Sequence, residues 1–349
     1  LCENLHMNTP GSLMAAEINE IPRVFQAIAD HSAEYTKLIT ELNLSSFDSV
    51  ILVARGTSDN AALYLKYLIE TMVGIPVGLA SPSVVTIYGA KLKFKNCLVI
   101  ALSQSGQSPD LVAYTVAAKA GGAKVLALTN APDSPLAQTA DCHLYLLAGE
   151  EKSVAATKSY SAELLLSLVV ASAWSKSEID FSALISEAEK NVTNVDQVKN
   201  IAEAFDHTPG VTTLGRGFAY CNAHEAALKI KETLKAPVSS FSSADYLHGP
   251  ISSLKESSRV IFIAPAGAAM EGMSASVARI REITPHIYWI GAGAQPIDNE
   301  ISLGGSNLPE KLAVIADSIV LQQFALFLSL KNGLNPDAPI GLLKVTKTK

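Results

Sequence analysis

One loop combines serine hydroxyls with a tight turn in a way that suits the binding of a small anion. Ser103-Gln104-Ser105-Gly106-Gln107-Ser108-Pro109 follows an apolar run and precedes a helical pattern. Gly106 permits a sharp turn, and Pro109 suits the first turn of a helix. Backbone N–H groups and the helix dipole then favour an anion, to which the hydroxyls add donors. Because no lysine completes a nucleotide-binding P-loop and no positive charge is nearby, a sugar phosphate is favoured. The alternative is that Ser108 only caps the helix.

A second set of residues could carry out acid–base chemistry. The stretch from His224 to Glu232 has the pattern of a helix, on which Lys229 is four residues after Glu225 and three before Glu232. Glutamate and lysine at these spacings usually form solvated pairs. The spacing alone therefore makes Glu232 a candidate base without excluding an ordinary surface charge.

Two further segments complete the set of candidates. His248 lies in a turn, Asp245-Tyr246-Leu247-His248-Gly249-Pro250, whose Gly-Pro end disfavours helix and strand. A histidine on a rigid loop suits proton transfer, although such a residue is more often structural or solvated. Val154-Ala155-Ala156-Thr157-Lys158 begins a helix, where small residues let a ligand approach free N–H groups. The alternative there is an ordinary cap by Thr157.

The elements that position these residues follow an alternating pattern. Short β-branched runs alternate with longer helical stretches, which is typical of βαβ units on parallel sheets. The expected strands cover residues 50–54, 76–80, 97–102, 124–128, 143–147, 211–214, 237–241, 259–264, 286–290 and 312–316. The expected helices cover 60–73, 110–120, 157–175 and 320–331, with a polar helical connector over 181–205.

The two halves of the chain repeat each other. Three elements recur at an offset of 161 residues: Arg55-Gly56 as Arg216-Gly217, Ser103–Gly106 as Ala264–Gly267, and Lys124–Thr129 as Pro285–Ile290. Three matches at one offset indicate an internal duplication. We therefore expect an α/β protein of two tandem flavodoxin-like domains, each a parallel sheet flanked by helices.

The two copies differ at the ends of their strands. The first copy has hydroxyls there, at Thr57, Ser58 and the serine-rich loop, whereas the second has Gly217-Phe218-Ala219 and Ala264-Pro265-Ala266. Ligands of doubly wound sheets bind beyond the carboxyl ends of the strands. The first half is therefore expected to bind the anion.

Composition excludes several classes of protein. The 349 residues, 48% of them hydrophobic and 17% charged, suggest about two domains and exclude general disorder. A net charge of −6 and the lack of a basic cluster argue against nucleic-acid binding. The apolar runs are interrupted or too short for a membrane span, and the start has no signal-peptide pattern. Cys2, Cys97, Cys142 and Cys221 are too dispersed for a zinc site or a disulfide framework, so a reducing cytoplasm is expected.

These residues together resemble the sugar isomerase (SIS) domain family. The matching motifs are Ser103-Gln104-Ser105-Gly106, Arg216-Gly217, Leu228-Lys229-Ile230-Lys231-Glu232 and Leu247-His248-Gly249-Pro250. The separation between Glu232 and His248 also matches. From about Leu13 onward the chain is similar to the isomerase half of glutamine–fructose-6-phosphate aminotransferase. Its tail, residues 335–348, resembles the stand-alone SIS deaminases that act on glucosamine 6-phosphate.

The resemblance implies a division of the chain into five segments. They are an N-terminal helical segment (13–45), a phosphate-binding SIS domain (46–178), a helical connector (179–205), a second SIS domain with the acid–base residues (206–333), and a tail that covers the active site (334–349).

The resemblance also implies how the substrate is held. The phosphate would be bound by Ser103, Gln104, Ser105 and Ser108. The sugar hydroxyls would be held by Thr57, Ser58 and the backbone of Val154 and Ala155, with Lys229 beside the base. The family often has serine where this chain has Ala156, which removes one expected sugar contact.

Three residues match catalytic positions of the family. His248 would open the pyranose ring, and Glu232 would move a proton between C1 and C2. Lys344 on the tail would cover the open-chain sugar and stabilise developing oxyanion charge. The resemblance further implies that His248 reaches the site from the partner subunit of a homodimer.

These roles lead to the hypothesis of an isomerising deaminase that converts glucosamine 6-phosphate to fructose 6-phosphate and ammonia, with no metal or cofactor. The aminotransferase has a glutaminase domain that the roughly 45 residues before the first strand cannot hold, so ammonia release is expected. Alternatives are a deaminase or deglycase for galactosamine 6-phosphate or 6-phosphofructosamine, an aldose–ketose isomerase, and a non-catalytic sugar-phosphate sensor. The presence of both Glu232 and His248 argues against the sensor.

Overall fold

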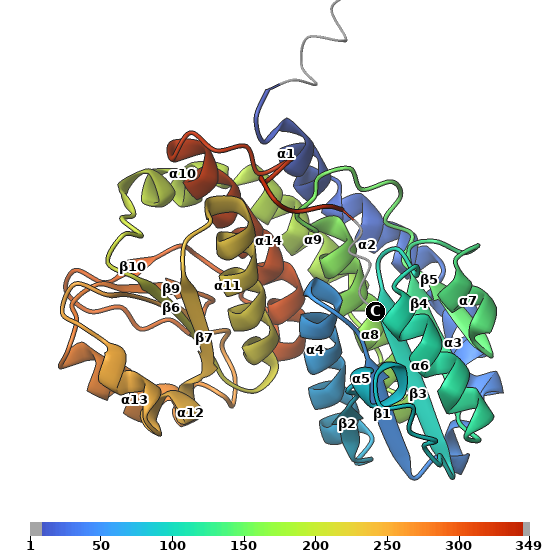
Figure 1. Cartoon of the computed structure of the whole chain (residues 1–349). Coiled ribbons are helices and arrows are strands. Elements are labelled where there is room, and N and C mark those ends of the chain that lie inside the picture. Colours follow the sequence, from blue (N-terminus) through green and yellow to red (C-terminus); the bar gives the residue numbers. More distant parts are fainter. Residues whose placement is uncertain (1–8, 345–349) are drawn as a thin grey trace, which may run out of the picture. The chain divides into compact units, whose positions relative to one another are not determined.

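Two parallel five-stranded sheets organise the chain, for which a computed structural model describes residues 9–344 (Figure 1). The described residues form two units with one sheet in each. We call the unit that contains the loop at residues 103–108 the serine-loop unit; it comprises residues 23–151, 158–181 and 343–344. The other unit, which contains Glu232, is called the Glu232 unit and comprises residues 9–22, 152–157 and 182–342. Each unit therefore combines segments that are distant in the sequence.

The sheet of the serine-loop unit has the strand order β2-β1-β3-β4-β5. Its central strand β3 is buried at every position, as expected where helices cover both faces of a parallel sheet. Val50 of the first strand pairs in register with Leu98 of β3 and with Val77 of β2. The strands are β1 (Ser49–Val53), β2 (Val77–Leu79), β3 (Cys97–Ser103), β4 (Lys124–Thr129) and β5 (Cys142–Tyr145).

The helices of this unit pack on the two faces created by the pleat of the sheet. On one face, Val99 and Ala101 of β3 form a core with Leu111 and Tyr114 of α6. Elsewhere in the unit α8 packs against α4 and α3. The helices are α2 (Ile21–Asp30), α3 (Ser32–Glu41), η1 (Leu44–Ser46), α4 (Thr57–Met72), α5 (Ser83–Thr86), α6 (Pro109–Ala120), α7 (Pro135–Thr139) and α8 (Lys158–Ser175).

The sheet of the Glu232 unit has the order β10-β9-β8-β6-β7. Its strands are β6 (Val211–Gly215), β7 (Val238–Ser242), β8 (Arg259–Ile263), β9 (Ile287–Ile290) and β10 (Ile301–Ser302). Its helices are α1 (Ser12–Asn19), α9 (Phe181–Thr193), α10 (Val195–Ala204), η2 (Gly217–Ala219), α11 (Tyr220–Leu234), α12 (Ser243–Leu247), η3 (Pro250–Ser253), η4 (Glu271–Met273), α13 (Ser274–Arg281) and α14 (Glu310–Lys331).

The two sheets have the same topology, which confirms the expected fold class. Numbered within its own half, each sheet has the order 2-1-3-4-5 of flavodoxin-like folds. The repeat extends to backbone conformation: Gly56 and Gly217, 161 residues apart, have φ of 58° and 57° after their respective strands. Few residues other than glycine adopt this conformation readily.

One predicted strand is wrong. Residues 312–316, expected as a strand before a helix at 320–331, belong instead to the single helix α14. Leu312, Val314 and Ile315 are all buried, together with most other residues of α14. A helix buried on all sides has no amphipathic period, so its apolar run cannot be distinguished by pattern from a buried strand. The fifth strand is β10, which has 2 residues.

The other predicted strands lie within two residues of the observed bounds. The expected connector over 181–205 is divided into α9 and α10 at Asn194. Helix α14 is long and apolar enough to cross a membrane, but 94% of the relevant stretch is buried inside the protein. It is therefore the core helix of its unit.

A buried acid on α14 provides a test of this packing. The Asp317 side chain is fully buried, and its Oδ1 accepts a hydrogen bond from the Ser306 backbone N–H at 2.7 Å. Burial raises the pKa of Asp317 to about 7; hydrogen bonds from Ser306 oppose the rise, and Glu187 adds to it. Because the folded-state pKa lies above the ordinary value, stability is lost as the pH rises from about 4 to about 7.

We therefore expect Asp317→Asn to gain stability relative to the wild type as the pH rises from about 4 to about 7, and to keep a constant difference above that pH. Thermal unfolding across this range measures the difference. Asp298→Asn, which changes an exposed acid of the same unit, should show no such trend. A pH-independent difference for Asp317→Asn would contradict the burial of a protonated acid.

Candidate functional site

The serine loop (residues 103–108) is a tight turn that its own hydroxyls hold in place. The Oγ atoms of Ser103 and Ser105 accept hydrogen bonds from the backbone N–H groups of Gly106 and Gln107, at 3.1 and 3.3 Å. Gly106 has φ +61°, and a Cβ atom there would lie 2.1 Å from the Ser134 hydroxyl oxygen. Because each serine uses a lone pair within the loop, its O–H remains a donor for a ligand.

Ser108 occupies the N-cap position of α6 without capping the helix. Its backbone is extended, with φ −62° and ψ 119°, and its side chain makes no cap hydrogen bond. The buried Oγ has no hydrogen-bond partner among residues 9–344. The capping alternative is therefore wrong. Ser108 instead has an unused hydroxyl at the start of α6, directly after the serine loop.

The expectation that no positive charge is near the serine loop is also wrong. Arg55 Nη2 lies 3.1 Å from Oδ2 of Asp110, which is in the first turn of α6. The Asp110 side chain is 5% exposed, so this ion pair is partly buried. No local sequence pattern indicates this ion pair, because Arg55 follows β1, a different strand from the one that precedes the loop.

The matching loop of the second repeat is closed by a carboxylate of its own unit. Glu310 Oε2, at the start of α14, accepts a hydrogen bond from the Ala268 N–H at 3.1 Å. A Cβ atom at Gly267, the counterpart of Gly106, would lie 2.2 Å from the same oxygen. A backbone donor that could bind an external anion is thus already occupied, which supports the expectation that the first repeat binds the anion.

Thr57 and Ser58 begin α4, directly after the turn at Gly56. The Ser58 hydroxyl is buried and donates a hydrogen bond to Glu163 Oε1 of α8 at 2.7 Å. Because the hydroxyl proton of Ser58 is directed to Glu163, the Ser58 oxygen can accept a hydrogen bond from a ligand but cannot donate one.

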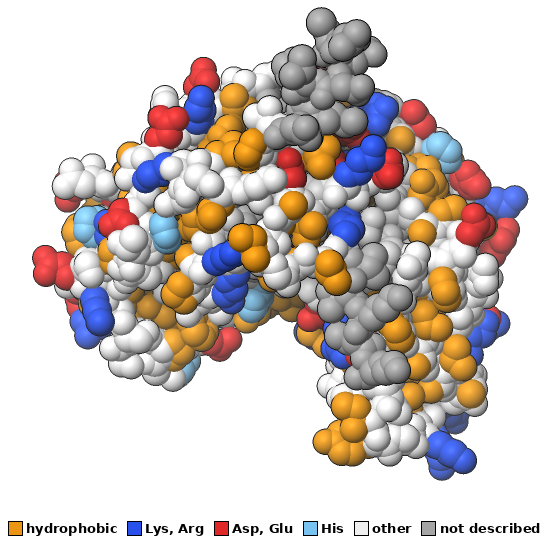
Figure 2. All heavy atoms as spheres, turned by 45° about the horizontal axis from the view of Figure 1, so that its top comes forward, with side chains coloured by type: hydrophobic (Ala, Val, Ile, Leu, Met, Phe, Trp, Pro, Cys, Tyr) orange, Lys and Arg blue, Asp and Glu red, His pale blue; other side chains and the backbone are white. Residues whose placement is uncertain are grey.

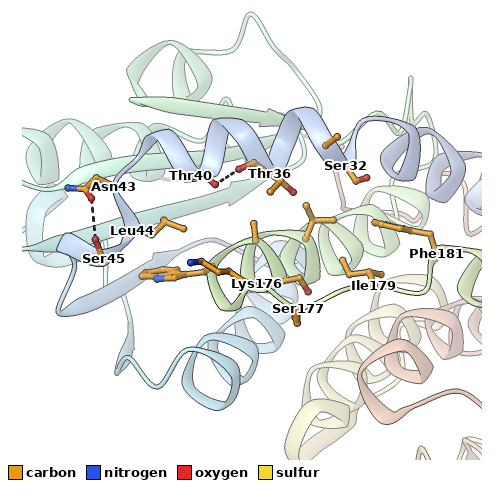
Figure 3. A pocket seen from close by; sticks show the side chains of 15 residues that line it. Ser32, Thr36, Thr40, Asn43, Leu44, Ser45, Lys176, Ser177, Ile179 and Phe181 are labelled. Carbon is orange, nitrogen blue, oxygen red and sulfur yellow. Dashed lines mark hydrogen bonds between the residues drawn. The ribbon is translucent and has the colours of Figure 1, made fainter.

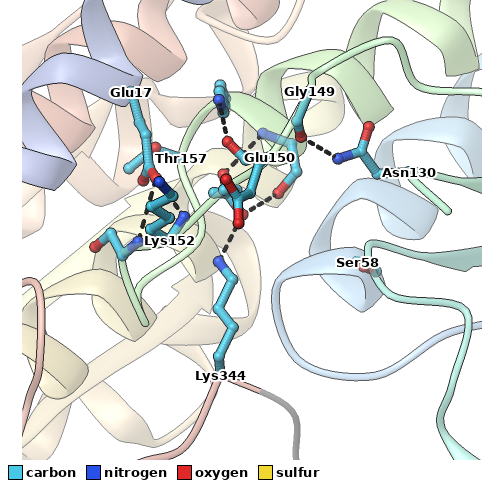
Figure 4. Close-up of polar contacts among 12 residues, drawn as sticks. Glu17, Ser58, Asn130, Gly149, Glu150, Lys152, Thr157 and Lys344 are labelled. Atoms are coloured by element: carbon cyan, nitrogen blue, oxygen red, sulfur yellow. Dashed lines mark hydrogen bonds and ion pairs between the residues drawn. The ribbon is translucent and has the colours of Figure 1, made fainter.

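Lys344 is held by a buried acid that the sequence analysis missed. The Nζ atom of Lys344, which is labelled in Figure 4, lies 2.7 Å from Glu151 Oε2. The Glu151 side chain is fully buried. Glu151 also accepts hydrogen bonds from the backbone N–H and hydroxyl of Ser159, at 3.1 and 2.8 Å. Lys158 donates to the Glu150 carbonyl oxygen at 2.6 Å. The adjacent acids Glu150 and Glu151 have no periodic pattern that indicates a buried position, so only the structure identifies this ion pair.

The segment at Val154 is fixed by the start of the tail. The Val154 N–H donates to the backbone oxygen of Asp337 at 3.0 Å, and Ala155 is fully buried. The Asp337 carboxylate accepts from the N–H groups of Leu13 and Met14, at 3.1 and 2.8 Å, at the start of α1. The Val154 N–H is thus engaged within the unit, so it is not one of the free N–H groups expected in this segment.

Lys229 lies between two acids on α11 and forms an ion pair with each. The interpretation of these as ordinary solvated surface pairs is wrong, because the Lys229 side chain is buried. The side chains of Lys229 and Glu225 are both 0% exposed, with 3.5 Å between Lys229 Nζ and Glu225 Oε1. Lys229 Nζ also donates to Glu232 Oε2, and the Glu232 side chain is 24% exposed. Glu232 is therefore a carboxylate fixed from inside the unit and open to solvent on one side.

His248 lies at the C-terminal end of α12, in the turn expected from the sequence. Its backbone N–H donates to the Asp245 oxygen at 3.0 Å, and Gly249 follows with φ +129°. The His248 side chain is exposed in the single chain. This position suits a group that acts on a ligand or across a subunit contact.

The structure divides the predicted site residues between the two units. Within the Glu232 unit, Lys229 is bonded to Glu232, and this unit also contains Val154, Ala155 and His248. Within the serine-loop unit, the residues of the loop lie together, and Lys344 is paired with Glu151. Thr57 and Ser58 belong to the serine-loop unit as well.

Other surfaces lack the predicted site residues. A pocket of about 890 Å³ lies between α3 and the end of α8, lined by Thr36, Trp174 and Lys176 among others (Figure 3). On the face shown in Figure 2, basic and acidic side chains are interspersed. No group of three or more His, Cys, Asp or Glu residues in the described part of the chain is placed to hold a metal.

Two glycines allow the shape of the serine loop to be tested with a matched control. Gly106 and Gly89 both have φ +61°, but a Cβ atom at Gly89 would meet nothing within 4 Å. In both alanine variants the free energy of unfolding should fall by about 1 kcal/mol, because alanine is strained at this φ. In Gly106→Ala it should fall by about 1–3 kcal/mol more, because the added Cβ atom collides with Ser134. Denaturant unfolding of the two variants measures the difference, and equal losses would contradict the packing of this loop.

Comparison with known proteins agrees with this architecture. The SIS domain family model matches residues 43–173. A crystal structure described as a proposed phosphosugar isomerase from Silicibacter pomeroyi has 31% identity and a TM-score of 0.81, covering 93% of this chain and 99% of that one. The glucosamine-6-phosphate deaminase from Thermotoga maritima has a TM-score of 0.73 over 93% of this chain and 99% of that one, but at 21% identity it shows the fold alone.

Curated relatives extend the match across both repeats. Glutamine–fructose-6-phosphate aminotransferase [isomerizing] from Pyrococcus horikoshii is 30% identical over 340 residues, which cover 95% of this chain. The match covers 57% of that relative, so the chain spans little more than half the length of such proteins. With two matching sheets, the serine loop in the first repeat and a solved relative matched over nearly its whole length, the chain belongs to the SIS domain family.

Proposed function

We propose that this protein is an isomerising deaminase that converts glucosamine 6-phosphate and water to fructose 6-phosphate and ammonia. The observation that carries the proposal is the fixed carboxylate of Glu232, which buried Lys229 holds at a partly exposed position. Moving a proton between adjacent carbons requires a base held in one place. The relatives named as isomerising aminotransferases of fructose 6-phosphate support a phosphorylated amino sugar as substrate.

The serine loop would anchor the phosphate. Its O–H groups, the unused hydroxyl of Ser108 and the start of α6 provide hydrogen-bond donors and a favourable helix dipole. Gln104 would add an amide donor. Thr57, Ser58 and the carbonyl oxygens at Val154 and Ala155 would then orient the sugar hydroxyls.

The reaction would begin with opening of the pyranose ring. His248 would move a proton from the anomeric hydroxyl to the ring oxygen, giving the open-chain aldehyde with its amine at C2. The exposed turn of His248 suits a contribution from the partner subunit of a homodimer. We propose this arrangement together with a cytoplasmic location.

Glu232 would then remove the proton from C2 and return one to C1. Together with movement of one proton from the amine nitrogen to the C1 oxygen, this transfer converts the amino aldehyde to a C2 imine with a hydroxyl at C1. Water adds to the imine carbon, the C–N bond breaks, and ammonia leaves the ketone of fructose 6-phosphate. Lys344 would stabilise the negative charge that develops on oxygen in the transition state.

The direct test measures both products from glucosamine 6-phosphate. Ammonia and fructose 6-phosphate should form in equal amounts. If the enzyme instead turned over galactosamine 6-phosphate or 6-phosphofructosamine, the assigned substrate would be wrong. Interconversion of phosphosugars without release of ammonia would indicate an aldose–ketose isomerase. Binding of all these sugars without turnover would leave a sensor and overturn the proposed activity.

Replacing Glu232 with Gln should lower kcat by about 10²- to 10⁴-fold, since that is the usual contribution of a positioned general base. Binding of the substrate phosphate should change little, because the serine loop is intact. Steady-state kinetics and equilibrium binding measure the two effects separately. Glu203→Gln, an exposed acid on α10, is the matched control. Unchanged turnover in Glu232→Gln would show that the assigned base is wrong.

Lys344→Met should lower kcat by about 10²- to 10³-fold through loss of charge stabilisation. Lys124→Met removes an exposed lysine from the same unit and should leave kcat unchanged. Equal kcat values for the two variants would exclude a catalytic role for the tail lysine.

A further inference from the structure

The Glu232 unit has a polar cavity at the end of its sheet opposite to the carboxyl ends of the strands. The cavity, of about 400 Å³, is lined by the first residues of β6 and β7 and by parts of α11, α12 and η3. Thr212 and Ser239 are register partners on the two strands, so their side chains share one face of the sheet. We call this cavity the amino-end pocket; its polar lining comes from Thr212, Lys231, Ser239, Tyr246, Ser253 and Ser258.

Two lining groups lack protein partners. The Tyr246 side chain is 1% exposed, and its hydroxyl, although near Thr212, has no hydrogen bond of ordinary geometry within residues 9–344. Lys231 is exposed and forms no ion pair with the described residues. A buried hydroxyl without a partner is unfavourable unless water or a ligand satisfies it.

The amino-end pocket also adjoins both elements that carry the candidate acid–base residues. Lys231 directly precedes Glu232 on α11. Tyr246 and Ser253 lie on either side of the His248 turn, two residues before His248 and five after it. An occupant would therefore contact both flanks of the turn while it binds α11.

We propose that the amino-end pocket is a second ligand site, for a phosphorylated monosaccharide or a molecule of similar size and charge. One lysine suits a single anionic group, and five surrounding hydroxyls suit a ligand rich in hydroxyls. The volume is within the usual range for small-molecule sites. Binding at this site does not depend on the proposed function; only an effect on turnover through the His248 turn rests on it.

His224 provides a local reporter of occupancy. Burial lowers the pKa of His224, and the positive charge of Lys231 lowers it further. An anion bound at Lys231 would offset that charge and so raise the pKa of His224. NMR titration of the histidine ring signals, with His224→Gln to assign the resonance, measures this change without any enzymatic assay.

The experiment titrates the full chain with glucose 6-phosphate and, separately, with inorganic phosphate. In the wild type and in Lys199→Met, an exposed lysine variant on α10, glucose 6-phosphate should raise the pKa of His224. Lys231→Met should lose the response, with affinity about 10- to 100-fold weaker. Tyr246→Phe should bind about 2- to 10-fold more weakly without a lower unfolding temperature, since within residues 9–344 its buried hydroxyl has no hydrogen bond of ordinary geometry to lose.

Several results would overturn the proposal. They are no change at His224 in the wild type, the same change in Lys231→Met, and unaltered affinity in Tyr246→Phe. An equal response to inorganic phosphate at equal affinity would exclude recognition of the sugar. A protein that shows the His224 response but releases no ammonia would refute the proposed function alone, whereas an active deaminase without the response would refute only this site.

Discussion

The buried ammonium group of Lys229 is the constraint on which the candidate site depends. A charge that is fully removed from water is strongly unfavourable unless anionic partners lie close to it. Glu225 provides one partner from inside the unit, and Glu232 provides the other at the surface. The position of the proposed base is therefore determined by the packing of α11. Removing Lys229 would leave buried Glu225 without its cation, so the same interaction stabilises the helix and orients Glu232.

The duplicated fold has two loops at equivalent positions, and their backbone groups have different hydrogen-bond partners. In the first repeat the hydroxyls hold the loop, and the Ser108 hydroxyl has no hydrogen-bond partner within the described residues 9–344, so donors remain for a ligand. In the second repeat the carboxylate of Glu310 binds the corresponding backbone. One copy of the fold thus keeps donors for the phosphate that we propose as its ligand, while the other is stabilised by an internal anion. The second unit carries the proposed acid–base residues instead.

Much of this arrangement could be predicted from the sequence. Strands of parallel sheets are short apolar runs at regular spacing, and the offset of 161 residues between the halves identified the duplicated order. Residues 312–316 were assigned wrongly because a fully buried helix has no polar face. The candidate motifs lie on the expected helices and loops, but the environments of their side chains were not predicted. Periodicity could not show that Lys229 is buried, that Arg55 pairs with Asp110, or that Glu151 binds Lys344, because these depend on side-chain burial or on contacts between distant segments.

In the proposed mechanism, the Glu232 carboxylate moves the proton between C1 and C2. Because its side chain is 24% exposed, a proton held by Glu232 should exchange with solvent during turnover. Conversion of glucosamine 6-phosphate in D₂O, with mass spectrometry and NMR of the fructose 6-phosphate, tests this directly. If Glu232 transfers the proton, deuterium should appear at C1 of the product. Product without deuterium at C1, in which the C2 hydrogen has moved intact, would contradict transfer through a solvent-exchanging carboxylate.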